Sequence, residues 1–578
     1  MDIKENLFGW LDYTVFIGML LISSVIGVFY ACKGKQSADD ILLGGKSMGV
    51  IPVAASIMAT FMSATGLLGI PAEQFLYGTQ LILSYTVIVM PLMTCMSSYL
   101  IVPVFYNLGS CSANEYLEKR FGKPIRGFSC IFYLLTMIFF MGIALYAPAL
   151  ALTQVTGLHV YITVWGGMKA VVWTDTFQTV IMFGAVVWIV VKGIINSGGM
   201  GQVWADNWET DRLNFFNFDP SPYTRVTFWN AVLGGSIAML GAYATNQATI
   251  QRYLSLPTLK DAKRAVWVAL PMFTIIHVLT LLVGMVVISK YRYCDPIKTK
   301  RISTADQLFP LFVMDTMGSI PGIPGIFVAG IFSASLSTVS SGINSLTAVV
   351  YEDVIKPYVW PKLTDRQALR LLKVMSVISG ILCILAAMVS GFMGNVIQAT
   401  MFAFGLLGAP MFGTFMLGLF VPFANNKGAL TGLFTGFVFN LWMGVGAMHN
   451  LSYYPTLEKD YVDGCPEKYF NVSGHEFNKT LHAEMIQGEI ARTESIFPIY
   501  RISFMYYMLI GVVIVMVIGT VTSFAFGASQ LDDMDAKLFV PPIAEIVEKK
   551  QKAKKARRID VKMEEMSMLS KKHYDYDA

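Results

Sequence analysis

Long apolar stretches recur along almost the whole chain, and they constrain its fold more than any other feature. A helix needs about 20 apolar residues to cross the hydrocarbon core of a bilayer. Of the 578 residues, 55% are hydrophobic and 14% are charged, whereas a soluble protein has about 25% charged residues. The sequence therefore predicts an all-α polytopic membrane protein. We place spans near residues 12–32, 50–75, 81–105, 127–150, 171–195, 227–250, 266–289, 322–350, 375–393, 397–420, 429–447 and 502–527. A thirteenth, the fifth in chain order and abnormally short, lies near 155–167; alternatively, the chain turns at Pro148 and divides residues 129–167 into two spans.

The distribution of lysine and arginine in short loops predicts the orientation, because cytosolic loops are enriched in both. Four basic loops and the tail segment KKQKAKKARR at 549–558 share one side if there are thirteen crossings, and only the basic loop 290–301 then falls on the other. We therefore expect an extracellular N-terminus at 1–11, a transmembrane domain at 12–527 and a cytosolic basic tail at 528–578. The polar, lysine-rich tail is interpreted as disordered, and the protein is expected in the plasma membrane.

The loop at 449–501 is the longest one predicted outside the cell. It contains three acceptor sequences for N-glycosylation, at Asn450, Asn471 and Asn478. Among the seven cysteines, Cys294 and Cys465 are the two predicted on that oxidising face outside the spans, and disulfides form in such an environment. We predict a disulfide bond between them and a glycan on at least one asparagine.

The stretch 54–75, AASIMATFMSATGLLGIPAEQF, carries small and hydroxylated residues at its middle. They are Ser63, Ala64, Thr65 and Gly66, followed by Gly69 and Pro71. Such residues permit a break in the helix, whose freed carbonyls then need a cavity, an ion or a substrate. The alternative is close helix packing, since small residues let two backbones approach. This stretch alone leaves both interpretations open.

A second stretch, residues 331–346 (IFSASLSTVSSGINSL), is rich in hydroxyl groups. Ala334, Ser337 and Thr338 are spaced i, i+3 and i+4, so they share one face of a helix. Two hydroxyls and a nearby carbonyl are hard oxygen ligands that suit a hard cation. Hydroxyls in membrane helices also bond back to their own helix carbonyls, but the eight serines and threonines from 333 to 347 exceed what that role requires. The face predicts a sodium site that needs further oxygens from the broken span.

Several long motifs occur in a fixed order along the chain. They are ATFMSA at 59–64, YAPALALTQVTGL at 146–158, GGMKAVVWTDTFQ at 166–178, NQATIQRY at 246–253, SASLSTVSSGIN at 333–344 and YEDVIKP at 351–357. In these motifs the chain resembles the sodium–solute symporter family, and within it the branch of sodium/iodide, sodium-coupled monocarboxylate and sodium-dependent multivitamin transporters. The resemblance implies a LeuT-type fold with two inverted five-helix repeats, about 50–195 and about 227–420.

The resemblance also implies ligands for the coupling ion and the substrate. The expected sodium ligands are the carbonyls of Ala59, Met62 and Ala334, the hydroxyls of Ser337 and Thr338, and Thr400 for a second ion. The expected substrate residues are Gly66, Tyr243, Asn246 and Gln247. Sugar and iodide carriers of the family resemble each other in having glutamine at the Gly66 position. Its absence here favours a small organic monoanion.

Two ionisable residues in predicted spans, Asp175 and His277, each allow more than one role. Asp175 in the predicted span 171–195 is either a group on the sodium path or a charge at a helix N-terminus, and we favour the second. His277 stands alone in the span 266–289, and we expect it to pack against a local partner.

Taken together, the sequence predicts sodium-coupled, electrogenic symport of a monocarboxylate or a carboxylate vitamin by alternating access. Its expected partners are that anion and the bilayer, with sodium as coupling ion, no organic cofactor and no nucleic acid; the oligomeric state is left open. An enzyme is excluded because no nucleophile–base set, metal cluster or phosphate loop occurs. Three alternatives stay open. One is iodide or another inorganic anion as substrate, and another is an ion channel. The third is a transport-deficient isoform that acts as a sensor or trafficking partner, since relatives have a full crossing where only residues 159–165 remain here.

Overall fold

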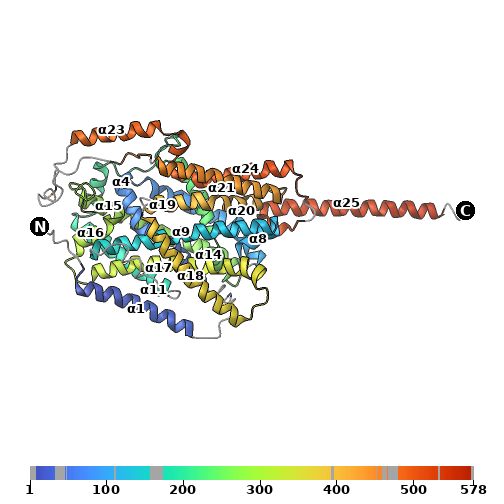
Figure 1. Cartoon of the computed structure of the whole chain (residues 1–578), viewed down its shortest axis with the longest axis horizontal. Coiled ribbons are helices and arrows are strands. Elements are labelled where there is room, and N and C mark those ends of the chain that lie inside the picture. The colour runs from blue at the N-terminus through green and yellow to red at the C-terminus, as the bar shows by residue number, and fades with distance from the viewer. Residues whose placement is uncertain are drawn as a thin grey trace.

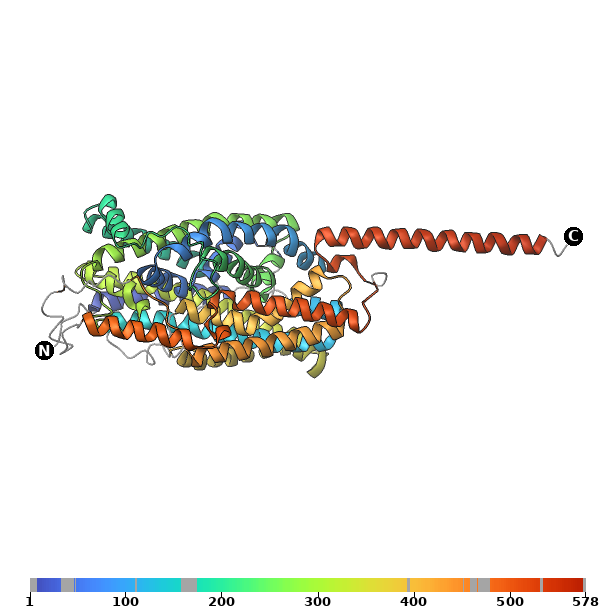
Figure 2. The ribbon, with the colours of Figure 1, turned by 90° about the horizontal axis from the view of Figure 1, so that it is seen from above.

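Helices form one elongated bundle, and they run mostly along its long axis (Figure 1, Figure 2). The computed structural model describes residues 8–32, 46, 48–109, 112–156, 174–391, 396–450, 452–457, 465, 479–530 and 534–574, with no strand among them. A long helix, α25 (Pro541–Tyr574), leaves one end of the bundle. We call that end the tail end. The opposite end, to which the Cys294–Cys465 disulfide belongs, is called the disulfide end.

Eight helices in the described part of the chain are long and apolar enough to span a membrane. They are Gln80–Leu108 (α5 to α7), Lys123–Thr156 (α9), Leu259–Tyr291 (α15), Ile323–Val359 (α17 and η7), Asp365–Ser390 (α18), Val396–Phe420 (α19, η8 and α20), Asn426–His449 (α21) and Phe504–Ala525 (η10 and α24). Two bent pairs raise the number to ten: Val50–Phe61 (α3) with Ala64–Tyr77 (α4), and Met182–Asn196 of α11 (Thr174–Asn196) with Met200–Glu209 (α12). The count of thirteen crossings stays a prediction.

The remaining elements are shorter or lie at the periphery. They are α1 (Trp10–Cys32), α8 (Ala113–Phe121), η4 (Asn230–Gly235), α13 (Ser236–Leu240), η5 (Gly241–Thr245), α14 (Gln247–Leu254), η6 (Ala305–Gln307), α16 (Leu308–Met317), α23 (Lys479–Ser495), η9 (Pro498–Arg501) and η12 (Ala536–Leu538). Helix α23 lies within the long loop predicted at 449–501.

The first broken helix is the pair α3 and α4, which are bent by 53° relative to each other. Helix α3 ends at Phe61, and Ser63 begins α4 by accepting a hydrogen bond from the Thr65 N–H at 3.3 Å. A serine side chain at an N-cap replaces a helical backbone bond, so it stabilises a new start. The predicted break is present, and Gly69 and Pro71, which follow it in the sequence, lie inside α4.

A second broken helix runs from η4 to α14. Asn246 is extended, with φ −69° and ψ 129°, and its side chain caps α14 by accepting from the Ala248 N–H at 2.9 Å. Gly234 in this span serves close packing, because a Cβ there would lie 2.0 Å from the Met505 carbonyl oxygen. One broken helix thus falls near the start of each predicted repeat. The repeat bounds, 50–195 and 227–420, stay predictions.

Helix α9 tests one way in which the chain could compensate for its short fifth span. A turn at Pro148 would have divided residues 129–167 into two spans, but α9 continues through this proline to Thr156. That alternative is therefore wrong. The short span itself lies mostly outside the described residues, which resume at Thr174 with α11.

The prediction of a disordered tail is wrong for residues 534–574. Phe539 is 2% exposed, and the Val540 N–H donates to the Leu419 carbonyl at 3.3 Å, so the tail docks on the bundle before α25 begins. The Arg120 guanidinium lies 5.1 Å from the Phe539 ring. The apolar residues at the start of the tail, such as Phe539, are buried against the bundle. The helix α25 that follows is polar and can extend into solvent without such a contact.

Candidate functional site

The predicted sodium ligands come from two helices that meet at the first break. The Thr338 hydroxyl of α17 is within donating distance of the Thr60 carbonyl of α3 at 2.9 Å and of its own Ala334 carbonyl at 3.2 Å. The Ser337 hydroxyl, one residue away, is buried without a hydrogen-bond partner among the described residues. The structure therefore brings the hydroxyl face of α17 against the end of α3.

Ala59 and Met62 lie at that helix end. Ala59 is in the last turn of α3, and Met62 follows Phe61 as the C-cap, donating its N–H to the Met58 carbonyl at 2.9 Å. The last carbonyls of a helix lack intrahelical partners. Carbonyl oxygens with one uncommitted hydroxyl at Ser337 form a donor set of the kind a hard monovalent cation needs.

Thr400, expected to serve a second sodium, lies apart from this set. It is on α19 and donates its hydroxyl hydrogen to the Val396 carbonyl at 2.8 Å. Its side chain lines a cavity beside the break.

That cavity has a volume of ≈ 130 Å³ and is mostly apolar. None of its lining residues is Asp, Glu, Lys or Arg. The lining consists of Phe61, Met62, Thr65, Gly66, Ile70, Leu81, Ile82, Tyr85, Met90, Phe140, Met239, Ala242, Phe273, His277, Ile397, Thr400, Met401 and Phe404. A site of this kind takes a small, largely apolar ligand and orients it through few polar groups.

Of the four predicted substrate residues, Gly66 lines the cavity. A Cβ at this position would lie 2.9 Å from the Met62 sulfur, so the glycine keeps the wall open beside a flexible side chain. Tyr243 lies behind the wall and stacks on Phe61, with ring centroids 4.3 Å apart.

Asn246 and Gln247 do not line the cavity either. Asn246 caps α14, and its amide nitrogen lies 3.4 Å from the Met137 sulfur. Gln247 accepts a hydrogen bond from the Ala113 N–H at 2.7 Å, at the start of α8. Both side chains are thus engaged in holding helices together, and their role as substrate ligands stays a prediction.

His277 of α15 packs beside Phe273, a residue of the same helix, with ring centroids 6.2 Å apart, so the expected local packing partner is present. Its side chain also lines the cavity, and the buried Nδ1 has no hydrogen-bond partner among the described residues. For Asp175 the structure gives the backbone only, which places it one residue after the start of α11 at Thr174.

At the disulfide end, Arg225 and Glu73 form a buried ion pair, which we call the Glu73–Arg225 clamp. Two parallel hydrogen bonds of 2.9 and 2.8 Å join the guanidinium to the carboxylate, and a third of 3.1 Å reaches Gln398 on α19. The guanidinium also lies 4.1 Å from the Tyr77 ring and 4.9 Å from the Phe504 ring. The clamp fixes α4 against the loop that precedes η4.

Toward the tail end, Arg252 of α14 forms a second set of contacts, which we call the Arg252 clamp. Its guanidinium donates to the hydroxyls of Ser56 at 3.0 Å and Ser341 at 2.6 Å, and to the hydroxyl of Thr60. It also donates to the Ala248 carbonyl of its own helix at 3.0 Å. The clamp joins α14 to α3 and α17, next to the predicted sodium ligands.

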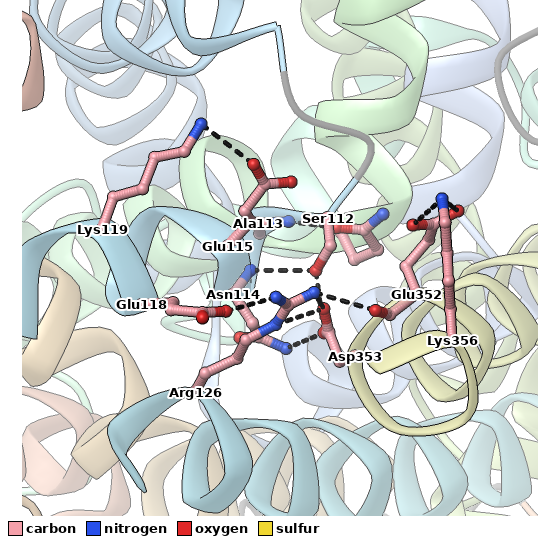
Figure 3. Close-up of polar contacts among 11 residues, drawn as sticks. Ser112, Ala113, Asn114, Glu115, Glu118, Lys119, Arg126, Glu352, Asp353 and Lys356 are labelled. Carbon is pink, nitrogen blue, oxygen red and sulfur yellow. Dashed lines mark hydrogen bonds and ion pairs between the residues drawn. The ribbon is translucent and has the colours of Figure 1, made fainter. Parts of the chain in front are cut away.

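A charged cluster ties α8, α9 and η7 together near the tail end (Figure 3). Arg126 contacts the Asp353 carboxylate at 2.6 and 2.9 Å and also pairs with Glu118. The other Asp353 oxygen accepts from Ser112 and Asn114, each at 2.8 Å. Protein donors occupy both oxygens of this buried carboxylate. The cluster therefore holds the three elements together.

The two clamps were missed by sequence reasoning. Glu73 carried a usable signal, because an ionisable residue within an apolar span is costly and marks function. Its partner lies 152 positions away in the sequence, and spacing alone does not identify it. Arg252 stood within the NQATIQRY motif without a visible partner.

The external features predicted from sequence fall at the disulfide end. Cys294 and Cys465 are joined by a disulfide with a Cα–Cα distance of 4.7 Å. Asn450 follows the end of α21, and its side-chain amide donates to the Gly446 carbonyl at 2.9 Å. Asn471 and Asn478 lie outside the described residues.

A helix bundle with two broken helices, an apolar cavity at a break and hard oxygen ligands beside it defines a secondary membrane transporter. The chain belongs to the sodium:solute symporter family, whose model matches residues 41–436. It is therefore a membrane-embedded, sodium-coupled solute symporter and not an enzyme.

Similar proteins and a solved structure agree with this assignment to the family and its fold. The chain is 40% identical to sodium-coupled monocarboxylate transporter 1 of Mus musculus over 89% of this chain and 87% of the relative. It is 39% identical to a Drosophila melanogaster protein named, provisionally, as a sodium-dependent multivitamin transporter, over 93% and 92%. A sodium-coupled sialic acid symporter in an outward-open state matches with a TM-score of 0.71 and 24% identity, over 90% of this chain and 100% of that one. That match confirms the LeuT-type fold.

Proposed function

We propose that this protein carries a small organic monoanion across the plasma membrane together with sodium, by electrogenic symport and alternating access. The observation that carries the proposal is the cavity beside the α3–α4 break, which is apolar and has no charged side chain in its lining. An anion bound there has no fixed cationic partner, so a sodium ion bound nearby supplies the positive potential. Coupling follows, because neither ion is well accommodated without the other.

The size and chemistry of the cavity favour monocarboxylates. About 130 Å³ bounded by aliphatic and aromatic side chains suits a short acid, and we name lactate and pyruvate first. Vitamins that bear a carboxylate come second, and the larger ones require the cavity to widen. Iodide stays the alternative, and Gly66 disfavours it because the chain lacks a polar side chain there. The relatives support carboxylates as a class, since one is named for monocarboxylates and another for vitamins.

The proposed sodium site consists of the carbonyls of Ala59, Met62 and Ala334 with the hydroxyls of Ser337 and Thr338. The contact between the Thr338 hydroxyl and the Thr60 carbonyl supports it, because it places α17 directly against the end of α3. Sodium bound there would hold α3 against α17. Thr400 is the proposed ligand of a second sodium, and Tyr243, Asn246 and Gln247 are proposed to turn toward the substrate as the transporter changes state.

We propose that the disulfide end faces the outside of the cell and the tail end the cytosol. The disulfide and the predicted glycan acceptors Asn450, Asn471 and Asn478 support this orientation, because both modifications belong to the oxidising side. The basic residues of α25 then lie on the cytosolic side, as the positive-inside rule requires.

Uptake by cells that express the chain tests the proposal. We expect labelled lactate and pyruvate to enter in sodium medium, to stop in choline medium and to produce an inward current that saturates with substrate. Currents that do not saturate with substrate would indicate a channel. A preference for iodide would show that the substrate is an inorganic anion rather than a carboxylate. If the protein reaches the cell surface but takes up none of these substrates, the transport-deficient alternative is favoured. The short segment 159–165 is the reason for that alternative.

A further inference from the structure

A buried histidine that has one unpartnered ring nitrogen lines the same cavity. His277 of α15 is 4% exposed, and its Nδ1 has no hydrogen-bond partner among the described residues. Its backbone carbonyl lies within 3.0 Å of the Thr280 hydroxyl. The imidazole packs beside Phe273, with ring centroids 6.2 Å apart. Packing therefore holds the ring in place, but it leaves the nitrogen uncommitted.

The other polar side chains of the cavity are more engaged. The Thr400 hydroxyl donates to the Val396 carbonyl at 2.8 Å, and the Thr65 hydroxyl shares a hydrogen bond with Ser63. The Tyr85 hydroxyl lies 3.9 Å from the Met401 sulfur, a weak acceptor. His277 is thus the lining group best placed to give an N–H to a ligand.

An unsatisfied nitrogen in such a place needs a physical explanation. Leaving a buried polar group without a partner destabilises a protein, and ionisable residues inside membrane spans generally serve function. A ligand that accepts a hydrogen bond removes the penalty when it binds. Neutral imidazole has one N–H donor, and hydrogen bonds to a carboxylate are stronger than those to a neutral acceptor.

We propose that His277 binds the carboxylate of the transported monoanion through an imidazole N–H. This inference rests on the proposed function and deepens it, because it names the group that recognises the acid. The carboxylate lies toward α15, and the rest of the substrate lies against the apolar walls formed by residues such as Phe140 and Ile397. The site then distinguishes an acid from a neutral amide of the same shape.

Ligand-induced thermal stabilisation of the purified full chain tests this, with butyrate and butyramide as a matched pair in sodium medium. For the wild type we expect stabilisation by butyrate and little by butyramide. His277→Phe keeps a ring but loses the donor, and we expect butyrate affinity to fall at least about tenfold, with sodium-induced stabilisation retained. His277→Gln keeps an amide N–H and should recover most of the affinity. The matched control is His449→Phe, the same substitution at an exposed histidine at the end of α21.

The outcomes separate the two proposals. If the wild type binds butyrate and His277→Phe binds it equally well, the role of His277 is overturned and the proposed function stands. If the wild type binds iodide and no carboxylate, both fall. If His277→Phe does not fold, His277→Met replaces it, since methionine adapts to irregular apolar gaps. In that case equal butyrate affinity for the methionine and glutamine variants overturns the inference.

Discussion

The two halves of the first broken helix, α3 and α4, are each held by a different arginine. The two arginines differ in burial and in the charge of their partners, so they hold the two halves with different strength. At α4, Arg225 makes a two-point ion pair with Glu73, and the two side chains are 6% and 2% exposed. At α3, Arg252 is half-buried and bonds to neutral hydroxyl and carbonyl groups. A buried charge that loses its ionic partner is strongly destabilising, whereas a solvated charge that loses a neutral partner is not. We infer that the disulfide end is closed more firmly than the tail end.

The two clamps also differ in what else they touch. The Arg252 clamp includes the hydroxyl of Thr60, whose carbonyl lies 2.9 Å from the Thr338 hydroxyl in the predicted sodium site. The Glu73–Arg225 clamp reaches Gln398, two residues from Thr400 on the same helix. The proposed sodium site therefore adjoins the Arg252 clamp, and Thr400, proposed for a second sodium, lies nearer the Glu73–Arg225 clamp.

The largest effect is expected from breaking the Glu73–Arg225 clamp. Glu73→Gln leaves the Arg225 charge buried without an ionic partner, and we expect a loss of about 3–5 kcal/mol in stability. Glu73→Leu combined with Arg225→Met removes both charges and should restore most of it. Thermal unfolding of the purified protein measures the difference.

A matched control for this experiment is Lys356→Met. It breaks the pair with Glu352, in which the lysine side chain is 54% exposed, and exposed pairs contribute little. If the single and double variants at Glu73 are equally unstable, the clamp does not depend on charge pairing.

A smaller effect is expected at the Arg252 clamp. Arg252→Met removes donors from neutral hydroxyls, and we expect a loss of about 1–3 kcal/mol with the fold retained. Hydrogen exchange should accelerate in α3 and stay unchanged in α4, because local opening follows the contacts removed. Equal acceleration in both helices would show that the two halves do not move independently.

Much of the fold was predictable because its signals are local. Apolar runs place the spans, and serine spacing along 333–347 places a hydroxyl face on α17. The break near Ser63 follows from residues that are adjacent in sequence. The glycines were ambiguous, because Gly234 serves close packing on Met505 and a break in the helix would require the same residue.

The parts that sequence could not predict depend on long-range pairing or on shape. Glu73 and Arg225 are 152 positions apart in the sequence, and only the tertiary fold brings them together. The position of His277 on a cavity wall depends on how α15 is rotated against α4 and α19. The family resemblance implied Asn246 and Gln247 as substrate ligands, but in this structure Asn246 caps α14 and Gln247 accepts a hydrogen bond at the start of α8.

The sodium ligands allow a sharper test with a smaller change in stability. Ser337→Ala removes a hydroxyl without a partner among the described residues, so we expect no loss of stability without sodium and a higher sodium concentration for half-maximal uptake. Adding Thr338→Val should also cost about 1 kcal/mol, since its bond to α3 is lost. The control is Ser335→Ala, at another buried serine of α17 whose hydroxyl lacks a partner among the described residues. A sodium dependence that is the same in Ser337→Ala, the double variant and the wild type would remove these hydroxyls from the site.

The smallest expected effect concerns Asp306, which lies in η6 between α15 and α16. One oxygen accepts from the Val396 N–H at 3.1 Å, and the other has no partner among the described residues. Burial raises the pKa of Asp306 from 3.8 to about 7, the Val396 hydrogen bond opposes the rise, and the Glu73 carboxylate adds to it. Because the folded-state pKa is raised, the stabilisation is complete below the ordinary value and is lost as pH rises through about 7. We expect thermal stability to fall between pH 6 and pH 8 by about 1 kcal/mol, and Asp306→Asn to remove this part of the pH dependence. A variant with the same pH profile as the wild type would show that Asp306 does not titrate in this range.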